Sequence, residues 1–140
     1  MSRSSAFFIF LAGLNGLMAV LAGAWAAHGS GAFPLVAGGD ALAESGSRFQ
    51  MFHALALLGV ALAHEAVPAP YSFFSRIFGT KTLLRLAGFA FIIGIIGFSG
   101  GLYASAAGTS TAGLAPIGGT ALMVGWLLMG LAGLVSLFAR

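Results

Sequence analysis

The polar side chains best suited to chemistry stand at the start of an apolar run, Arg48-Phe49-Gln50-Met51-Phe52-His53-Ala54-Leu55-Ala56-Leu57. Gln50 and His53 are three residues apart, so on a helix they share a face. Such a pair can bind a proton, a ligand or a lipid headgroup, or it can join a structural hydrogen-bond network. In a membrane, polar side chains turn toward partners or water, because lipid offers them none.

The composition indicates that lipid surrounds most of the chain. Of 140 residues, 59% are hydrophobic and only 6% are charged, whereas soluble domains have about 25% charged residues. The net charge of +3 comes from basic residues that mostly flank apolar runs, which indicates membrane topology and no nucleic-acid partner. The absence of cysteine excludes disulfides and thiolate metal ligands.

Hydropathy predicts an all-α integral membrane four-helix bundle in a single transmembrane domain, residues 1–140. The spans are expected at residues 6–27, 49–67, 86–107 and 116–139. Residues 6–27 carry no charge, and at about 1.5 Å per residue they can cross a ~30 Å hydrocarbon core. The second span is the most polar, with His53, His64 and Glu65, which fits a helix shielded by its neighbours.

A short helix on the outer side is expected to lead into the second span. Asp40 is predicted to cap it, because its carboxylate can accept from free backbone N–H groups, and Glu44 and Arg48 form an i,i+4 pair. Residues 67–84, with two prolines and several aromatic residues, are predicted to lie on the membrane surface.

The distribution of charge predicts the orientation. Five of the six basic residues lie on one side of a four-span chain: Arg3, Arg76, Lys81, Arg85 and Arg140. The excess of Lys and Arg in cytoplasmic loops therefore places both termini and the middle loop in the cytoplasm.

In this orientation, each helix brings a polar group to the outer half. The candidate polar cluster consists of His28, Gln50, His53, Ser99 and Tyr103. Two interpretations remain open: a buried network that fixes helix order, or a site for a proton, ligand or lipid headgroup. Asn15 is expected to form an interhelical hydrogen bond, and Trp126 to be a packing residue.

No metal, cofactor or catalytic site is expected. His28 and His53, with Glu44 as a third ligand, would be a thin set for a metal. A proton path from His53 to His64 would cross apolar residues that cannot relay protons. The sequence shows no phosphate loop, paired carboxylates or serine with a compelling base, so we do not expect an enzyme.

Small residues at helical spacing predict close helix packing. The glycines concerned are Gly16, Gly23, Gly97, Gly101, Gly118 and Gly125. One seam runs along the first helix and another along the third. We expect one to close the monomer and the other to remain for a partner.

Four motifs in order resemble a known family. Gly23–Gly29 resembles Gly-Ala-Phe-Gly-Ala-His-Gly, Arg48–Leu57 resembles Tyr-Gln-Met-Tyr-His-Ala-Leu-Ala-Leu, and Phe98–Tyr103 resembles Phe-Ser-Gly-Ser-Leu-Tyr. Ala115–Gly119, followed by Gly125-Trp126, resembles Thr-Pro-Ile-Gly-Gly and Gly-Trp. The family is that of the small membrane proteins called domain of unknown function 423. The chain departs from the family pattern at Trp25, Phe49, Phe52, Gly101 and Ala115, and all of these changes except Trp25 remove a hydroxyl.

The resemblance implies a four-helix protein of a bacterial inner (plasma) membrane and supplies no activity. We expect a multi-pass protein that contacts membrane lipids and acts by association, as a homo-oligomer or as an accessory subunit of a membrane complex. The alternative is a small transporter or channel with an outer-side polar site around His53.

Overall fold

The protein is an all-α membrane protein. The computed structural model describes residues 1–29, 33–68, 79–111 and 113–138, and these contain no β-strand. Four helical stretches in this part of the chain are long and apolar enough to cross a membrane: Arg3–His28, Gly39–Ala66, Thr80–Ala106 and Leu114–Phe138. The predicted four-helix membrane fold is confirmed.

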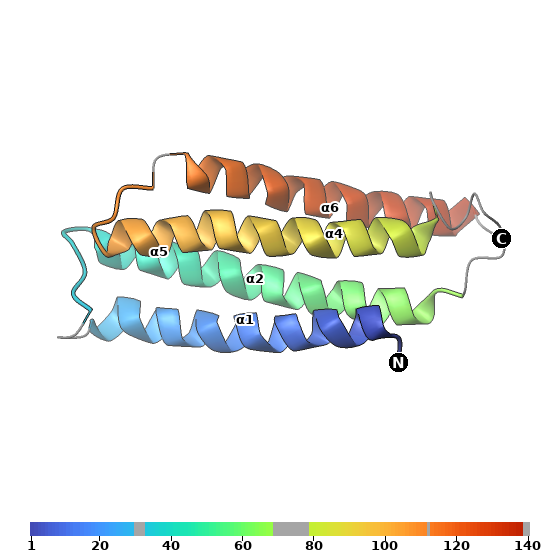
Figure 1. Ribbon diagram of the computed structural model, residues 1–140, viewed down its shortest axis with the longest axis horizontal. Helices are drawn as coiled ribbons and strands as arrows, with labels where there is room; N and C mark the ends of the chain where they lie inside the picture. The colour runs from blue at the N-terminus through green and yellow to red at the C-terminus, as the bar shows by residue number, and fades with distance from the viewer. Residues whose placement is uncertain (30–32, 69–78, 112, 139–140) are drawn as a thin grey trace.

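Each spanning helix runs antiparallel to the spanning helix before it (Figure 1). The elements are α1 (Arg3–His28), α2 (Gly39–Ala66), α4 (Thr80–Gly94), η1 (Ile95–Ser99), α5 (Gly100–Ala106) and α6 (Leu114–Phe138). α4, η1 and α5 together form the third spanning helix. We call the end that holds Arg3 and Phe138 the terminal end, and the end that holds His28 and Gly39 the far end.

Two helices are central and two lie at the edges. α1 packs mainly on α2, α2 also packs on the third spanning helix, and α6 packs on α4 and η1. In the most apolar stretch of each helix, 44% of α2 and 39% of the third span is buried, against 17% of α1 and of α6. The most polar span is thus the most shielded, as its composition predicted.

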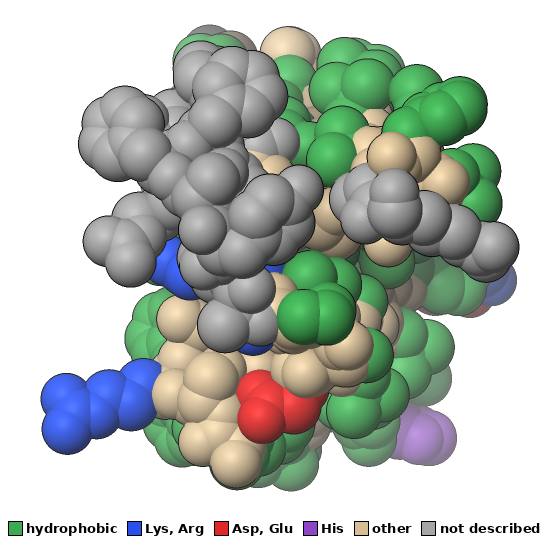
Figure 2. Space-filling view, turned by 90° about the vertical axis from the view of Figure 1, so that its right-hand side faces the viewer, with side chains coloured by type: hydrophobic (Ala, Val, Ile, Leu, Met, Phe, Trp, Pro, Cys, Tyr) green, Lys and Arg blue, Asp and Glu red, His purple; other side chains and the backbone are tan. Residues whose placement is uncertain are grey.

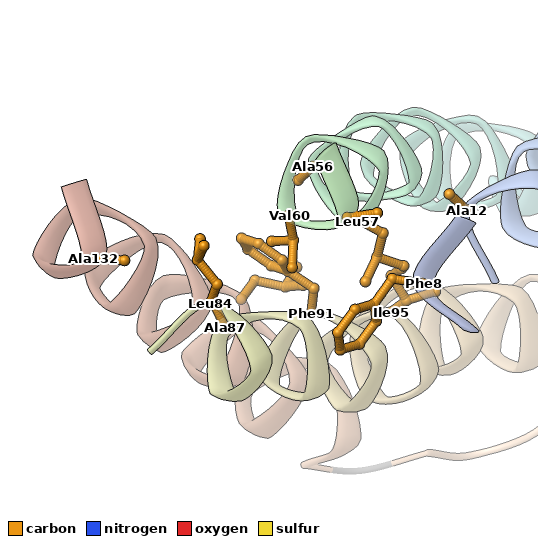
Figure 3. Close-up of a cluster of buried hydrophobic side chains, with 12 residues drawn as sticks. Phe8, Ala12, Ala56, Leu57, Val60, Leu84, Ala87, Phe91, Ile95 and Ala132 are labelled. Atoms are coloured by element: carbon orange, nitrogen blue, oxygen red, sulfur yellow. The ribbon is translucent and has the colours of Figure 1, made fainter. Parts of the chain in front are cut away.

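The core lies where α1, α2 and α4 meet. Phe8, Leu57 and Ile95 converge in Figure 3, with Val60 beside Phe91. Phe8 from α1 packs against Gly88 of α4, where an added Cβ would lie 2.5 Å from the Phe8 ring. The fit of the Phe8 ring against Gly88 therefore holds α1 and α4 together near the terminal end.

Two local expectations need correction. α2 begins at Gly39 with Gly38 as its N-cap, at φ 75°, and no side chain caps it. Asp40 lies instead in the first turn, where its carboxylate faces the positive end of the helix dipole. The third helix begins at Thr80, so Thr80 to Leu84 are helical, whereas residues 69–78 of the expected surface segment lie outside the described residues.

A π-helical turn interrupts the third span at Ile95–Ser99. There the backbones of the third and fourth spans touch, because a Cβ added at Gly118 would lie 2.1 Å from the Phe98 nitrogen. Such turns are rare and often occur at functional sites. The spacing of Gly97 and Gly101 predicted close helix packing but not this turn.

Residues of both predicted glycine seams pack inside the chain, but Gly16 of the first seam stays open, so a seam left for a partner stays a prediction. Gly97 meets Gly118, and Gly101 lies 3.4 Å from Ala115 by the same measure. On α1, Ala12 and Ala19 are buried against α2 and Gly23 lies against Ser47. Glycines whose added Cβ would meet no atom within 4 Å include Gly13, Gly16, Gly130 and Gly133.

Candidate functional site

Gln50 joins three helices through its side-chain amide. Its Nε2 donates to Asn15 Oδ1 on α1 at 3.0 Å, and its Oε1 accepts from the Tyr103 hydroxyl on α5 at 2.7 Å. Asn15 Nδ2 in turn donates to the Leu11 carbonyl at 2.9 Å. Gln50 is buried, and these bonds give each of its two polar side-chain atoms a partner inside the protein. The predicted interhelical bond of Asn15 is confirmed.

His53 bonds in a different direction, toward α6. Its Nδ1 lies 2.7 Å from the Phe49 carbonyl oxygen, and its Nε2 lies 3.1 Å from the indole Nε1 of Trp126. A carbonyl only accepts and an indole N–H only donates. Nδ1 must therefore carry the proton and Nε2 must accept, so the ring has no nitrogen left for a ligand.

Aromatic rings surround this imidazole. Phe91 lies 5.5 Å away between ring centroids, Trp126 lies 6.1 Å away, and Phe49 stacks on the imidazole at 6.1 Å. Gly125 allows Phe91 to approach α6, since a Cβ there would lie 2.5 Å from the Phe91 ring. His53 and Trp126 both lie near the middle of their helices, deeper than the expected outer position.

The five residues of the expected polar cluster do not form one site. Gln50 and Tyr103 are bonded to each other and His53 faces α6, whereas His28 is exposed at the far end. Ser99 is buried, and its hydroxyl has no hydrogen-bond partner among the described residues. In the part of the chain that the structure describes, no three His, Asp or Glu side chains gather as a metal site.

A second polar cluster lies at the terminal end, and the sequence did not reveal it. His64 is buried; its Nε2 accepts from Arg85 Nε at 3.2 Å, and its Nδ1 lies 3.2 Å from Ser5 Oγ. The backbone N–H of Ser2 donates to Glu65, at 2.9 Å from Oε2. These bonds join α1, α2 and α4 at the end that Figure 2 shows, where acidic and basic side chains lie among hydrophobic ones.

The Ser5–His64 pair is not arranged as a nucleophile and its base. Because Arg85 Nε only donates, His64 Nε2 must accept and Nδ1 carries the proton that faces Ser5. A general base needs a free nitrogen toward the hydroxyl. Ser5 is also only 1% exposed, so a substrate could not reach it.

An apolar layer separates the two polar clusters. Leu57, Val60 and Ala61 are fully buried between His53 and His64. The two histidines share no hydrogen-bond partner among the described residues. The arrangement therefore offers no hydrogen-bonded route for a proton between them.

Two hollows open on the surface of the described chain. One of about 510 Å³ lies between α2 and α6, with His53 and Trp126 at its wall and Phe52, Phe98 and Met123 around it. We call it the α2–α6 crevice. The other, of about 910 Å³, lies at the far end beside Trp25 and His28. Neither is lined by residues of both polar clusters.

The fold and its internally bonded polar groups define a small multi-pass membrane protein. A family model described as "Protein of unknown function (DUF423)" matches residues 22–119. Since this match covers more than half of the chain, the protein belongs to that family, and the predicted resemblance is confirmed.

Bacterial relatives agree with this assignment. A UPF0382 membrane protein of Haemophilus influenzae is 36% identical over 122 residues, covering 86% of this chain and 87% of the relative. The UPF0382 membrane protein YwdK of Bacillus subtilis is 33% identical, covering 87% and 91%. The UPF0382 inner membrane protein YgdD of Escherichia coli is 31% identical, covering 90% and 88%. No solved structure matches the chain.

These findings confirm the expected localisation. The chain is a multi-pass protein of the bacterial inner membrane, with four apolar helices and a relative described as an inner membrane protein. Its relatives carry no assigned activity in their names.

Proposed function

We propose that this protein acts by association in the inner membrane, as a homo-oligomer or as an accessory subunit of a larger membrane complex, and not as an enzyme. The observation that carries the proposal is the internal pairing of its membrane-embedded polar side chains. Gln50 and His53 each use both ends of their polar groups on other parts of the chain. Because the amide of Gln50 and the imidazole of His53 are already bonded inside the chain, they are not available to a solute, which supports a structural role over transport.

The edge helices supply the surfaces for association. α1 and α6 each bury one face and leave the rest outward. Lipid provides little hydrophobic force between helices, so contacts rely on small residues that let backbones approach. Gly16 on α1 and Gly130 on α6 have this freedom, since an added Cβ would meet no atom within 4 Å.

Mass measurement in mild detergent tests the proposal. We expect a particle heavier than the 14.1 kDa monomer, or specific crosslinks to other proteins in native membranes. Gly16→Leu and Gly130→Leu leave the internal packing free, so either should lower the assembled fraction at least severalfold if its helix is the interface. Leu62→Ile, at an exposed position on α2, is the control.

A monomer in several mild detergents, without crosslinks in native membranes, would contradict association. Transport would then be the better proposal, although the apolar layer at Leu57 and Val60 argues against it. Solute or ion flux in liposomes that is lost in His53→Ala would establish that alternative.

A further inference from the structure

We propose that the α2–α6 crevice holds a hydrocarbon chain of a membrane lipid at a fixed place against Trp126. This inference does not depend on association. It rests on three properties of the crevice: its depth and opening, its lack of free polar groups, and its size.

The crevice opens sideways at the depth of the lipid tails. Its walls come from the middle of α2, around Phe52 and His53, and the middle of α6, around Met123 and Trp126. Phe52 is 59% exposed and Met123 is 66% exposed at its rim. Because α2 and α6 both pack on the third span, the space between them faces the surrounding membrane. The molecules present at that depth are acyl chains.

The chemistry of the walls matches an apolar occupant. Among the described residues of the lining, His53 is the only ionisable one, and both of its nitrogens are bonded within the protein. The Trp126 N–H is the donor in one of these bonds. An occupant with a polar head would bury that head here without a hydrogen-bond partner, which is unfavourable, whereas a hydrocarbon has no hydrogen bond to lose.

The size favours a flexible chain over a helix from another protein. The lining on α2 runs from Phe49 to Leu55, which is about 10 Å long at ~1.5 Å per residue. A spanning helix crosses ~30 Å, so the crevice would contact only about a third of its length. An acyl chain can bend into a space of this size.

Photolabelling of the whole protein in vesicles tests the inference. The probe is a phosphatidylethanolamine with a diazirine near the middle of one acyl chain. We expect adducts concentrated on the peptide segments around Phe52 and Met123, in clear excess over Leu17, which is similarly exposed on α1. Even labelling of all exposed positions would show only the ordinary lipid layer and would overturn the proposal.

Filling the crevice supplies the decisive comparison. Gly119 lines the crevice, and a Cβ there would make ordinary contact with Phe98 at 3.5 Å. Gly119→Leu should therefore fold and reduce the crevice adducts at least threefold, whereas Gly130→Leu on the same helix should not. Met123→Trp at the rim provides a second filling variant should Gly119→Leu not fold.

Two results would contradict the lipid assignment. One is unchanged labelling in a folded filling variant. The other is crosslinking between two protein copies through a photoreactive residue at position 52 or 123, which would show that a second copy occupies the crevice.

Discussion

At the scale of single residues, the two buried histidines carry their proton on the same ring nitrogen for the same reason. Nε2 of each faces a group that can only donate, an indole for His53 and a guanidinium for His64. Each Nδ1 then donates to an oxygen, of Phe49 or of Ser5. Both rings therefore act as bridges between helices.

The Trp126–His53 bond should contribute measurably to stability. Trp126→Phe keeps a ring but removes the N–H, so Nε2 of His53 loses its donor in an apolar surrounding. In a double-mutant cycle with His53→Ala, we expect a coupling free energy of about 0.6 kcal/mol and at most about 1.7 kcal/mol. Unfolding in detergent measures it. Trp25→Phe, whose indole bonds to an exposed loop carbonyl, is the control, and strictly additive effects would contradict the prediction.

The Tyr103 hydroxyl should contribute on the same scale. Tyr103→Phe leaves Gln50 Oε1 without its donor, while the ring still packs against Gly46. We expect a loss of about 1 kcal/mol, seen as a lower melting temperature in detergent. Thr120→Ala, which removes an exposed hydroxyl bonded within its own helix, should have little effect; equal losses in the two variants would contradict a special role for Tyr103.

The sequence could identify these polar residues but not their partners. Three residues on a helix correspond to about 300°, so Gln50 and His53 point about 60° apart around α2. That difference turns Gln50 toward Asn15 and His53 toward Trp126. The rotation of α2 depends on the packing of all four helices, which no local pattern contains. Because the sequence does not show which helix His53 faces, it predicted Trp126 only as a packing residue and not as a hydrogen-bond donor.

At the scale of elements, glycine sets how closely the third and fourth spans approach. α6 buries Gly118, Gly125 and Ala132, and these residues recur every seven positions. Small residues at helical spacing are a signal of close packing that the sequence itself contains. The π-turn was not predictable, because it depends on how the backbone of Phe98 meets Gly118.

Adding one methyl group at the contact should therefore be costly. Gly118→Ala would place a Cβ 2.1 Å from the Phe98 nitrogen, so the backbones must separate. We expect a loss of roughly 1–3 kcal/mol, the usual cost of overpacking, measured as detergent stability. Gly130→Ala, with open space on the same helix, should be neutral or slightly stabilising because alanine favours helix. Equal effects at both positions would contradict the close contact.

At the scale of the whole molecule, the charges divide between the two ends. Arg3, Lys81 and Arg85 belong to elements that start at the terminal end, and Arg48 with its Glu44 partner lies toward the far end. This division was predictable from the sequence. Once hydropathy gives the four spans, the position of each charged residue along the chain gives the end at which it lies. The direction of insertion remains a prediction.

We expect the terminal end to face the cytoplasm, following the excess of Lys and Arg there. A green fluorescent protein fused after Arg140 should fluoresce, and alkaline phosphatase fused at the same place should stay inactive. A fusion of each reporter between α1 and α2 should give the opposite pattern. An active phosphatase at the C-terminal fusion would overturn this orientation.

The order of synthesis means that the Gln50–Asn15 bond can form before the His53–Trp126 bond. Asn15 and Gln50 both belong to the first helical hairpin, so they can pair while the second half of the chain is still in the ribosome. His53 must wait for Trp126, which lies in the last helix to emerge. Until then its Nε2 lacks this donor. Insertion of α6 thus completes a mid-membrane bond, and a chain truncated before α6 would display an unpaired imidazole that membrane quality control could detect.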